Sequence, residues 1–131
     1  MNSRIATCSC EQLTATATGE PAGVSICHCL ACQRRTGSVF GAQARFAGEQ
    51  VSVSGEASEY TRVGDEGSHA RFRFCPKCGA TVYYTIDEMP GAVVIPVGAF
   101  AEPTFPEPTF SVYEERMHNW IGLPAAIKHM A

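Results

Sequence analysis

The stretch CHCLACQRRTGS, residues 27–38, decides how the rest of the chain is interpreted. It places Cys27, Cys29 and Cys32 in the pattern C-x-C-x-x-C. Three thiolates at this spacing can occupy three corners of a zinc tetrahedron. Structural zinc sites have four protein ligands, whereas catalytic sites usually have three and leave one position for water or substrate. The presence or absence of a fourth protein ligand therefore decides which kind of site this is.

The remaining cysteines form two pairs that lie far apart in the sequence. Cys8 and Cys10 make a C-x-C, and Cys75 and Cys78 make a C-x-x-C. Together the pairs supply four thiolates, a complete ligand set for structural zinc. All seven cysteines are then used, as four and three, and the middle cluster is one ligand short. The sequence therefore predicts two Zn²⁺ sites, a complete four-cysteine site and a three-cysteine site whose fourth position is either open or filled by another ligand.

Length and composition narrow the class of protein. A chain of 131 residues predicts a single domain, 1–131, and 45% hydrophobic residues is ordinary for a soluble protein. A net charge of −3, with no basic run longer than two arginines, argues against nucleic acid as a partner. No stretch approaches the roughly 18 apolar residues of a membrane helix, and the first residues lack the apolar core of a signal peptide. We therefore expect a cytoplasmic protein whose thiols stay reduced.

Two other uses of the cysteines are weaker alternatives. Because seven is odd, complete internal disulfide pairing is impossible. A metal-free redox cluster at residues 27–32 is the second alternative. Redox C-x-x-C motifs usually open a helix in a βαβ unit, whereas this chain has mostly strand-like patterns.

Alternation of apolar and polar residues predicts strands along most of the chain, as in residues 13–18. Residues 71–74 lead into the late C-x-x-C and residues 81–86 leave it, which is the strand–knuckle–strand form of a zinc ribbon. A short helical turn is expected at residues 30–36, ended by Gly37. The sequence thus predicts a mainly β fold with one helical turn after the three-cysteine cluster.

Several side chains near the cluster are candidates for chemistry. His28 is the best placed general acid–base group because its ordinary pKa is near neutral pH, although strand alternation favours a surface or pocket-lining histidine that points away from the metal. Arg34 and Arg35 could bind carboxylates of a glutathione-like thiol, or form a solvated helix face, or compensate thiolate charge. His118 is a second acid–base candidate if the tail, residues 113–131, folds over the site. Trp120 is expected to be a packing anchor.

Taken in order, the motifs C-x-C from Cys8, C-H-C-x-x-C-x-x-x-T-G-S from Cys27, F-C-x-x-C-G from Phe74 and H-x-W-x-x-L-P from His118 form a pattern. This pattern resembles the glutathione-dependent formaldehyde-activating enzyme family, which shares its domain with centromere protein V. The resemblance covers nearly the whole chain. It implies the family's β-tent of small antiparallel sheets stapled by zinc. It also implies structural zinc ligands Cys8, Cys10, Cys75 and Cys78, and catalytic zinc ligands Cys27, Cys29 and Cys32.

The activity implied by the resemblance is similar to that of S-(hydroxymethyl)glutathione synthase, a carbon–sulfur lyase working in reverse. Zinc bound by three thiolates prefers a soft fourth ligand such as a thiol, and coordination deprotonates that thiol to a nucleophile. Attack on a small aldehyde then gives a hemithioacetal. We therefore expect a zinc-dependent carbon–sulfur lyase or synthase acting on a thiol adduct.

The expected partners are a small-molecule thiol such as glutathione and a small electrophile, without nucleic acid or membrane. A homodimer would be compatible with exposed sheet edges. The alternative is a non-catalytic, zinc-stabilised binding module, in which the second zinc is also structural. Its fourth ligand would then be His28, another histidine or water.

Overall fold

The computed structural model describes residues 2–64 and 66–130, and strands dominate this part of the chain. The strands are β1 Ser3–Thr7, β2 Thr14–Thr18, β3 Gly23–Cys27, β4 Gly41–Ala47, β5 Val51–Ser54, β6 Ser58–Val63, β7 His69–Phe74, β8 Thr81–Ile86, β9 Ala92–Pro96, β10 Phe110–Val112 and β11 Lys128–His129. The helices are α1 Leu30–Thr36 and the short 3₁₀ helices η1 Gly48–Gln50, η2 Val97–Phe100 and η3 Glu114–Arg116. The mainly β fold with a short helix after the three-cysteine cluster is confirmed.

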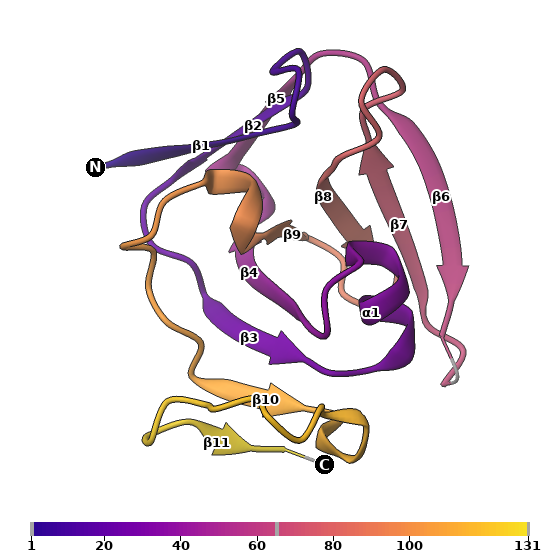
Figure 1. The fold of residues 1–131 in the computed structure, drawn as a ribbon. Coiled ribbons are helices and arrows are strands. Elements are labelled where there is room, and N and C mark those ends of the chain that lie inside the picture. Colours follow the sequence, from indigo (N-terminus) through magenta and orange to yellow (C-terminus); the bar gives the residue numbers. More distant parts are fainter. Residues whose placement is uncertain (1, 65, 131) are drawn as a thin grey trace.

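Within the described residues the strands form two sheets. One has the order β1-β2-β5, and the other has the order β11-β10-β3-β4-β9-β8-β7-β6. Neighbouring strands are antiparallel, except that β10 runs parallel to both β3 and β11. In Figure 1 the three-stranded sheet lies at the top, β6 to β8 lie on the right, and β10 and β11 lie at the bottom. The chain thus returns from the far hairpins to cover the edge strand that carries the first residue of the three-cysteine cluster.

The main core lies between the three-stranded sheet and one face of the larger sheet. In β2 and the residue before it, the alternating sequence buries Leu13, Ala15 and Ala17 and leaves the threonines between them half-exposed. Phe46 of β4 and Ile95 of β9 face them and are fully buried. Complete burial of such a large apolar side chain contributes about 1.5–3 kcal/mol, so this layer supplies much of the stability.

The opposite face of the larger sheet has a smaller cluster beside α1. Phe72 of β7, Tyr84 of β8 and Val94 of β9 are buried there, and the rings of Phe72 and Tyr84 lie 4.6 Å apart. The guanidinium of Arg35, from α1, lies over both rings. Helix α1 is therefore fixed against this face by a cation rather than by apolar side chains alone.

The tail differs from the sequence expectations. Its two short strands, β10 and β11, were not predicted, and Trp120 is 73% exposed, so its predicted role as a packing anchor is wrong. Trp120 lies in a turn segment outside the described strands, and its ring centre is 6.4 Å from that of His118. None of the helices in the described chain is long and apolar enough to cross a membrane.

Candidate metal centres and active site

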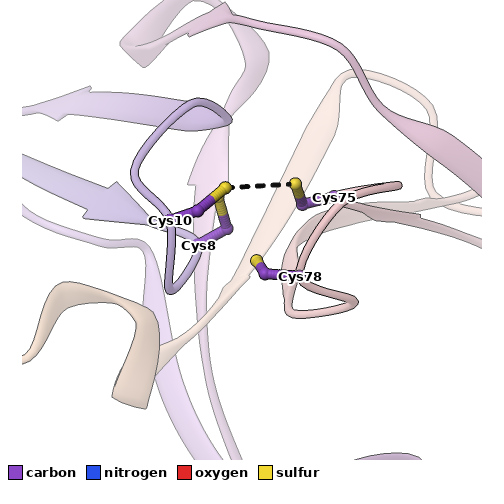
Figure 2. Close-up of side chains that lie close together, drawn as sticks. All are labelled: Cys8, Cys10, Cys75 and Cys78. Atoms are coloured by element: carbon purple, nitrogen blue, oxygen red, sulfur yellow. Dashed lines mark hydrogen bonds between the residues drawn. The ribbon is translucent and has the colours of Figure 1, made fainter.

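Two hairpin loops bring together the cysteines at positions 8, 10, 75 and 78. The first loop joins β1 to β2, and the second is the tip of the β7–β8 hairpin, where Gly79 adopts φ +80° to make the turn. Figure 2 shows the four side chains converging from these two loops. Their sulfur atoms all lie within 4.8 Å of one another. This group therefore links the three-stranded sheet to the larger sheet.

The sulfur spacing of the four-cysteine group fits a metal ion. The Sγ atoms of Cys8 and Cys10 are 3.7 Å apart, and those of Cys10 and Cys75 are 3.6 Å apart. Zinc–sulfur bonds of about 2.3 Å in a tetrahedron separate the sulfurs by about 3.8 Å. The donor set and its spacing therefore suit zinc.

Hydrogen bonds around the four-cysteine group also suit thiolates. The backbone N–H groups of Leu13 and Lys77 donate to the sulfurs of Cys8 and Cys75, each at 3.3 Å. The side chain of Gln12 donates to the Cys75 sulfur at 3.0 Å. Such N–H donors favour the charged form of sulfur, which is the form that binds metal.

The three-cysteine cluster is built locally at the junction of β3 and α1. Cys27 ends β3, Cys29 is the N-cap of α1, and Cys32 lies in the first turn of that helix. The Cys29 sulfur accepts the backbone N–H of Cys32 at 3.3 Å. The three sulfurs lie within 4.8 Å of one another, while among the described residues no fourth His, Cys, Asp or Glu atom joins them. This group could hold a metal ion with three protein ligands.

Electrostatics at the three-cysteine cluster favour a thiolate at Cys32. The hydrogen bond with Cys27, a second one with Cys29 and the charges of Arg35 and Arg62 together lower the pKa of Cys32 to about 5, against the opposing effect of burial. The same interaction and burial raise the pKa of Cys27. Cys27 and Cys32 are buried and Cys29 is partly exposed, so Cys29 is the most accessible thiol of the cluster.

His28 lies between two cluster cysteines and is completely buried, unlike the surface or pocket-lining position considered from the sequence. Its Nε2 lies 3.0 Å from the Ser111 hydroxyl, and its backbone N–H donates to the carbonyl of Val112. Burial lowers the pKa of His28 against the charge of Glu114, which favours the neutral ring. Its Nδ1 is buried without a hydrogen-bond partner in the described structure. His28 thus ties the cluster to β10.

The tail does fold against α1, through Gln33. The Gln33 side-chain amide donates to the carbonyls of His28, at 2.9 Å, and Arg116, at 3.2 Å. Its oxygen lies 3.0 Å from Nε2 of His118, which is exposed. His118 is thus held next to the helix that carries Cys32.

The two arginines after the cluster have different surroundings. Arg34 is exposed. Arg35 is half-buried, with its Cζ 5.0 Å from the centre of the Phe72 ring and 5.5 Å from that of Tyr84. Only Arg35 is therefore placed beside both the sheet face and the cluster.

Sequence reasoning missed four residues that shape these sites: Gln12, Gln33, Arg62 and Ser111. Gln12 and Gln33 sit next to cysteine motifs, but their amides have no sequence signature. Ser111 is 83 positions from His28, and Arg62 comes from the edge strand β6, so only the fold brings them to the cluster.

Comparisons with known proteins agree with this picture. The family model described as "Glutathione-dependent formaldehyde-activating enzyme" matches residues 3–116. No curated protein matches the chain. A crystal structure of a Rhodobacter sphaeroides protein is similar in fold, with a TM-score of 0.57 and 21% identity, over 72% of this chain and 85% of that one. The family match covers both cysteine groups, and the chain therefore belongs to the glutathione-dependent formaldehyde-activating enzyme family.

Proposed function

We propose that this protein is a zinc-dependent carbon–sulfur lyase or synthase acting on a thiol adduct, with its reaction site at Cys27, Cys29 and Cys32. One observation carries the proposal: a three-thiol group without a fourth protein ligand among the described residues stands beside a complete four-thiol group. The complete group suits a structural zinc, and the incomplete one suits a zinc that accepts an exogenous ligand. The family description supports glutathione and formaldehyde as substrates of this kind.

A zinc ion at this site would supply Lewis acidity that deprotonates a bound thiol. The protein's own residues set the charge around it. Three thiolates and a divalent ion leave a formal charge of −1, and Arg35 and Arg62 act on Cys32 with two positive charges. An incoming thiolate would bring this local sum to zero, which favours its binding over that of a neutral ligand.

In the reaction, the thiol sulfur bonds to the carbonyl carbon and the carbonyl oxygen takes a proton; cleavage reverses both steps. His28 is the proposed proton-transfer residue through its Nδ1, because Nε2 is engaged by Ser111. Its neutral ring could accept a proton. A shift in the pH profile of a His28→Gln variant that keeps its metal would support this role, and an unchanged profile would leave His28 as a positioning residue only.

Native mass spectrometry, with and without glutathione, tests the proposal. We expect two zinc ions per chain and a glutathione adduct in the wild type. Cys29→Ser should lose one zinc and the adduct, because Cys29 belongs to the three-cysteine group. The other zinc should remain, because Cys29 is not part of the four-cysteine group. Matched Ser9→Ala, which removes an exposed hydroxyl beside the other group, should keep both.

Each other result has a clear meaning. Two zinc ions without thiol uptake would point to the binding module instead of the enzyme. Full adduct formation by Cys29→Ser with the site empty of metal would refute the mechanism. Adduct formation followed by accelerated exchange of formaldehyde into the hemithioacetal, measured by NMR, would establish the carbon–sulfur chemistry.

A further inference from the structure

A small space lies beside the three-cysteine cluster, above Gly41 of β4. Gly41 is buried and is the register partner of Cys27. A Cβ atom built on Gly41 would lie 3.5 Å from the Cys32 Cβ, 3.5 Å from Nη2 of Arg35 and 3.4 Å from Oε1 of Gln43. These three side chains therefore face one point that the glycine leaves without a side chain.

Arg35 brings unused hydrogen-bond donors to this space. Its Nε is buried without a partner, and the guanidinium forms no ion pair within residues 2–64 and 66–130. The Phe72 and Tyr84 rings contact the guanidinium, while its Nη2 lies 3.5 Å from the point where a Cβ of Gly41 would be. Burying a donor without an acceptor costs free energy, so a guanidinium in this state is poised for an anionic ligand.

Arg62 adds to the positive charge. Its Cζ lies 5.0 Å from the centre of the same Phe72 ring, and in the described chain it too has no carboxylate partner. By contrast, Arg71 and Arg73 of the neighbouring strand β7 pair with Glu59. The two unpaired cations therefore gather on the side of the sheet that faces Cys32.

Gln43 brings an unused acceptor. Its side-chain N–H donates to the Ser25 hydroxyl at 2.9 Å, while its Oε1 is buried without a partner among the described residues. A cavity of about 200 Å³ adjoins Gln43 and is lined in part by Ser25, Arg45 and Tyr84. The body of a small ligand could lie in this cavity with a donor directed at Gln43.

We propose that the space above Gly41 and the cavity that adjoins Gln43 together form the specificity site for the thiol. The thiol carries a carboxylate that binds Arg35 and an N–H group that binds Gln43. This inference rests on the proposed function, since the ligand sulfur would lie at the open position of the three-cysteine cluster. A cysteine thiol with a free carboxyl and an acylated amino group meets both demands, because both groups are attached to the carbon next to the CH₂–S group; in glutathione the carboxylates lie further from the sulfur. Arg62 strengthens the selection for negative charge.

Four small thiols test the carboxylate contact with Arg35 and the N–H contact with Gln43 one at a time. N-acetylcysteine has both groups, 3-sulfanylpropanoate has only the carboxylate, N-acetylcysteamine has only the N–H, and 2-sulfanylethanol has neither. Binding to the zinc-loaded protein is measured by calorimetry and native mass spectrometry. We expect loss of the carboxylate to weaken binding about tenfold to hundredfold, and loss of the N–H about threefold to tenfold.

Variants of the protein test which residue makes each contact with the thiol. Arg35→Gln should weaken binding of the two carboxylate thiols more than that of the two thiols without a carboxylate, which lose only the effect of its charge on the cluster. Gln43→Leu should weaken only the two N–H thiols. Arg34→Gln is the matched control, because it removes the same charge from the exposed neighbour. In Gly41→Ala the new methyl meets its neighbours at ordinary contact distances of 3.4–3.5 Å, so the protein should fold and keep its zinc. That variant should bind N-acetylcysteine at least about tenfold more weakly and 2-sulfanylethanol unchanged.

The outcomes distinguish this inference from the function on which it rests. Equal affinity for all four thiols, or equal effects of Arg34→Gln and Arg35→Gln, would overturn the inference and leave the thiol-binding function intact. Uptake of none of the four thiols by the zinc-loaded protein would overturn both. Zinc stoichiometry and the thermal unfolding midpoint of each variant show whether a loss of affinity reflects loss of fold.

Discussion

Substitution of Gly55 by alanine should be one of the most damaging small changes in this protein. Gly55 follows β5 and adopts φ +102°, a conformation that alanine reaches only with strain. A Cβ at this position would lie 2.0 Å from the carbonyl oxygen of Gln12, in the loop that carries two cysteines of the four-cysteine group. That loop must therefore move by about 1 Å to reach even a tight contact of 3.0 Å.

The magnitude follows from what the movement disturbs. The side chain of Gln12 makes three hydrogen bonds, two with the backbone of Glu56, at 2.7 and 2.9 Å, and one with the Cys75 sulfur, at 3.0 Å. Each contributes about 0.5–1.5 kcal/mol. Together with a backbone strain of about 1–2 kcal/mol, Gly55→Ala should lower the free energy of unfolding by about 2.5–6.5 kcal/mol.

Gly37→Ala provides the matched control. Gly37 also has positive φ, +73°, but a Cβ there meets nothing within 4 Å, so only the strain of about 1–2 kcal/mol applies. Urea unfolding of the metal-loaded variants gives the two free energies, and transfer of metal to a chelator reports the four-cysteine group. A Gly55→Ala loss within about 0.5 kcal/mol of the Gly37→Ala loss would refute the reasoning.

Three further changes test other parts of the fold. Ser111→Ala should cost about 1–3 kcal/mol in urea unfolding, because it leaves the buried Nε2 of His28 without a partner; an unchanged midpoint would contradict this. Hydrogen bonds from His129, then from Ser111, hold the pKa of Glu114 below 4.5. The ionised Glu114 carboxylate should therefore stabilise the fold fully above pH 4.5, and this effect should be lost as the pH falls through the lower pKa of the folded state. The free energies of unfolding of the wild type and Glu114→Gln, measured against pH, should converge in acid. Trp120→Ala should leave stability within about 0.5 kcal/mol, and the single tryptophan should be quenched by iodide nearly as readily as free tryptophan; a protected indole would contradict its exposure.

Local sequence patterns were enough to predict the hairpins and the grouping of the cysteines. Residues 13–18 alternate strictly, and the C-x-x-C between two strand-like runs allows one compact hairpin tip. The split of seven cysteines into four and three follows from spacing alone. The hairpin prediction depends on short-range geometry, whereas the cysteine prediction depends on the four ligands that a structural zinc needs.

What could not be predicted depends on contacts between distant segments. The strand β11 has only two residues, too few for any periodicity, and it exists because β10 offers a parallel edge. His28 is buried because β10 covers it, which no pattern around the cysteines reveals. Arg34 and Arg35 are equivalent in the sequence, and only the packing of α1 on the sheet separates an exposed cation from one beside the cluster.

The two cysteine groups also differ in when they can form during synthesis. Cys27, Cys29 and Cys32 leave the ribosome almost together, so their cluster can be assembled as soon as that segment emerges. Cys10 and Cys75 are 65 residues apart, and at about 5–20 residues per second the first pair waits about 3–13 s for the second. During that interval two free thiols are open to oxidation or to the wrong metal. The group that fastens the two sheets is thus the last to close, and cellular zinc supply during translation should affect the yield of folded protein more than its later activity.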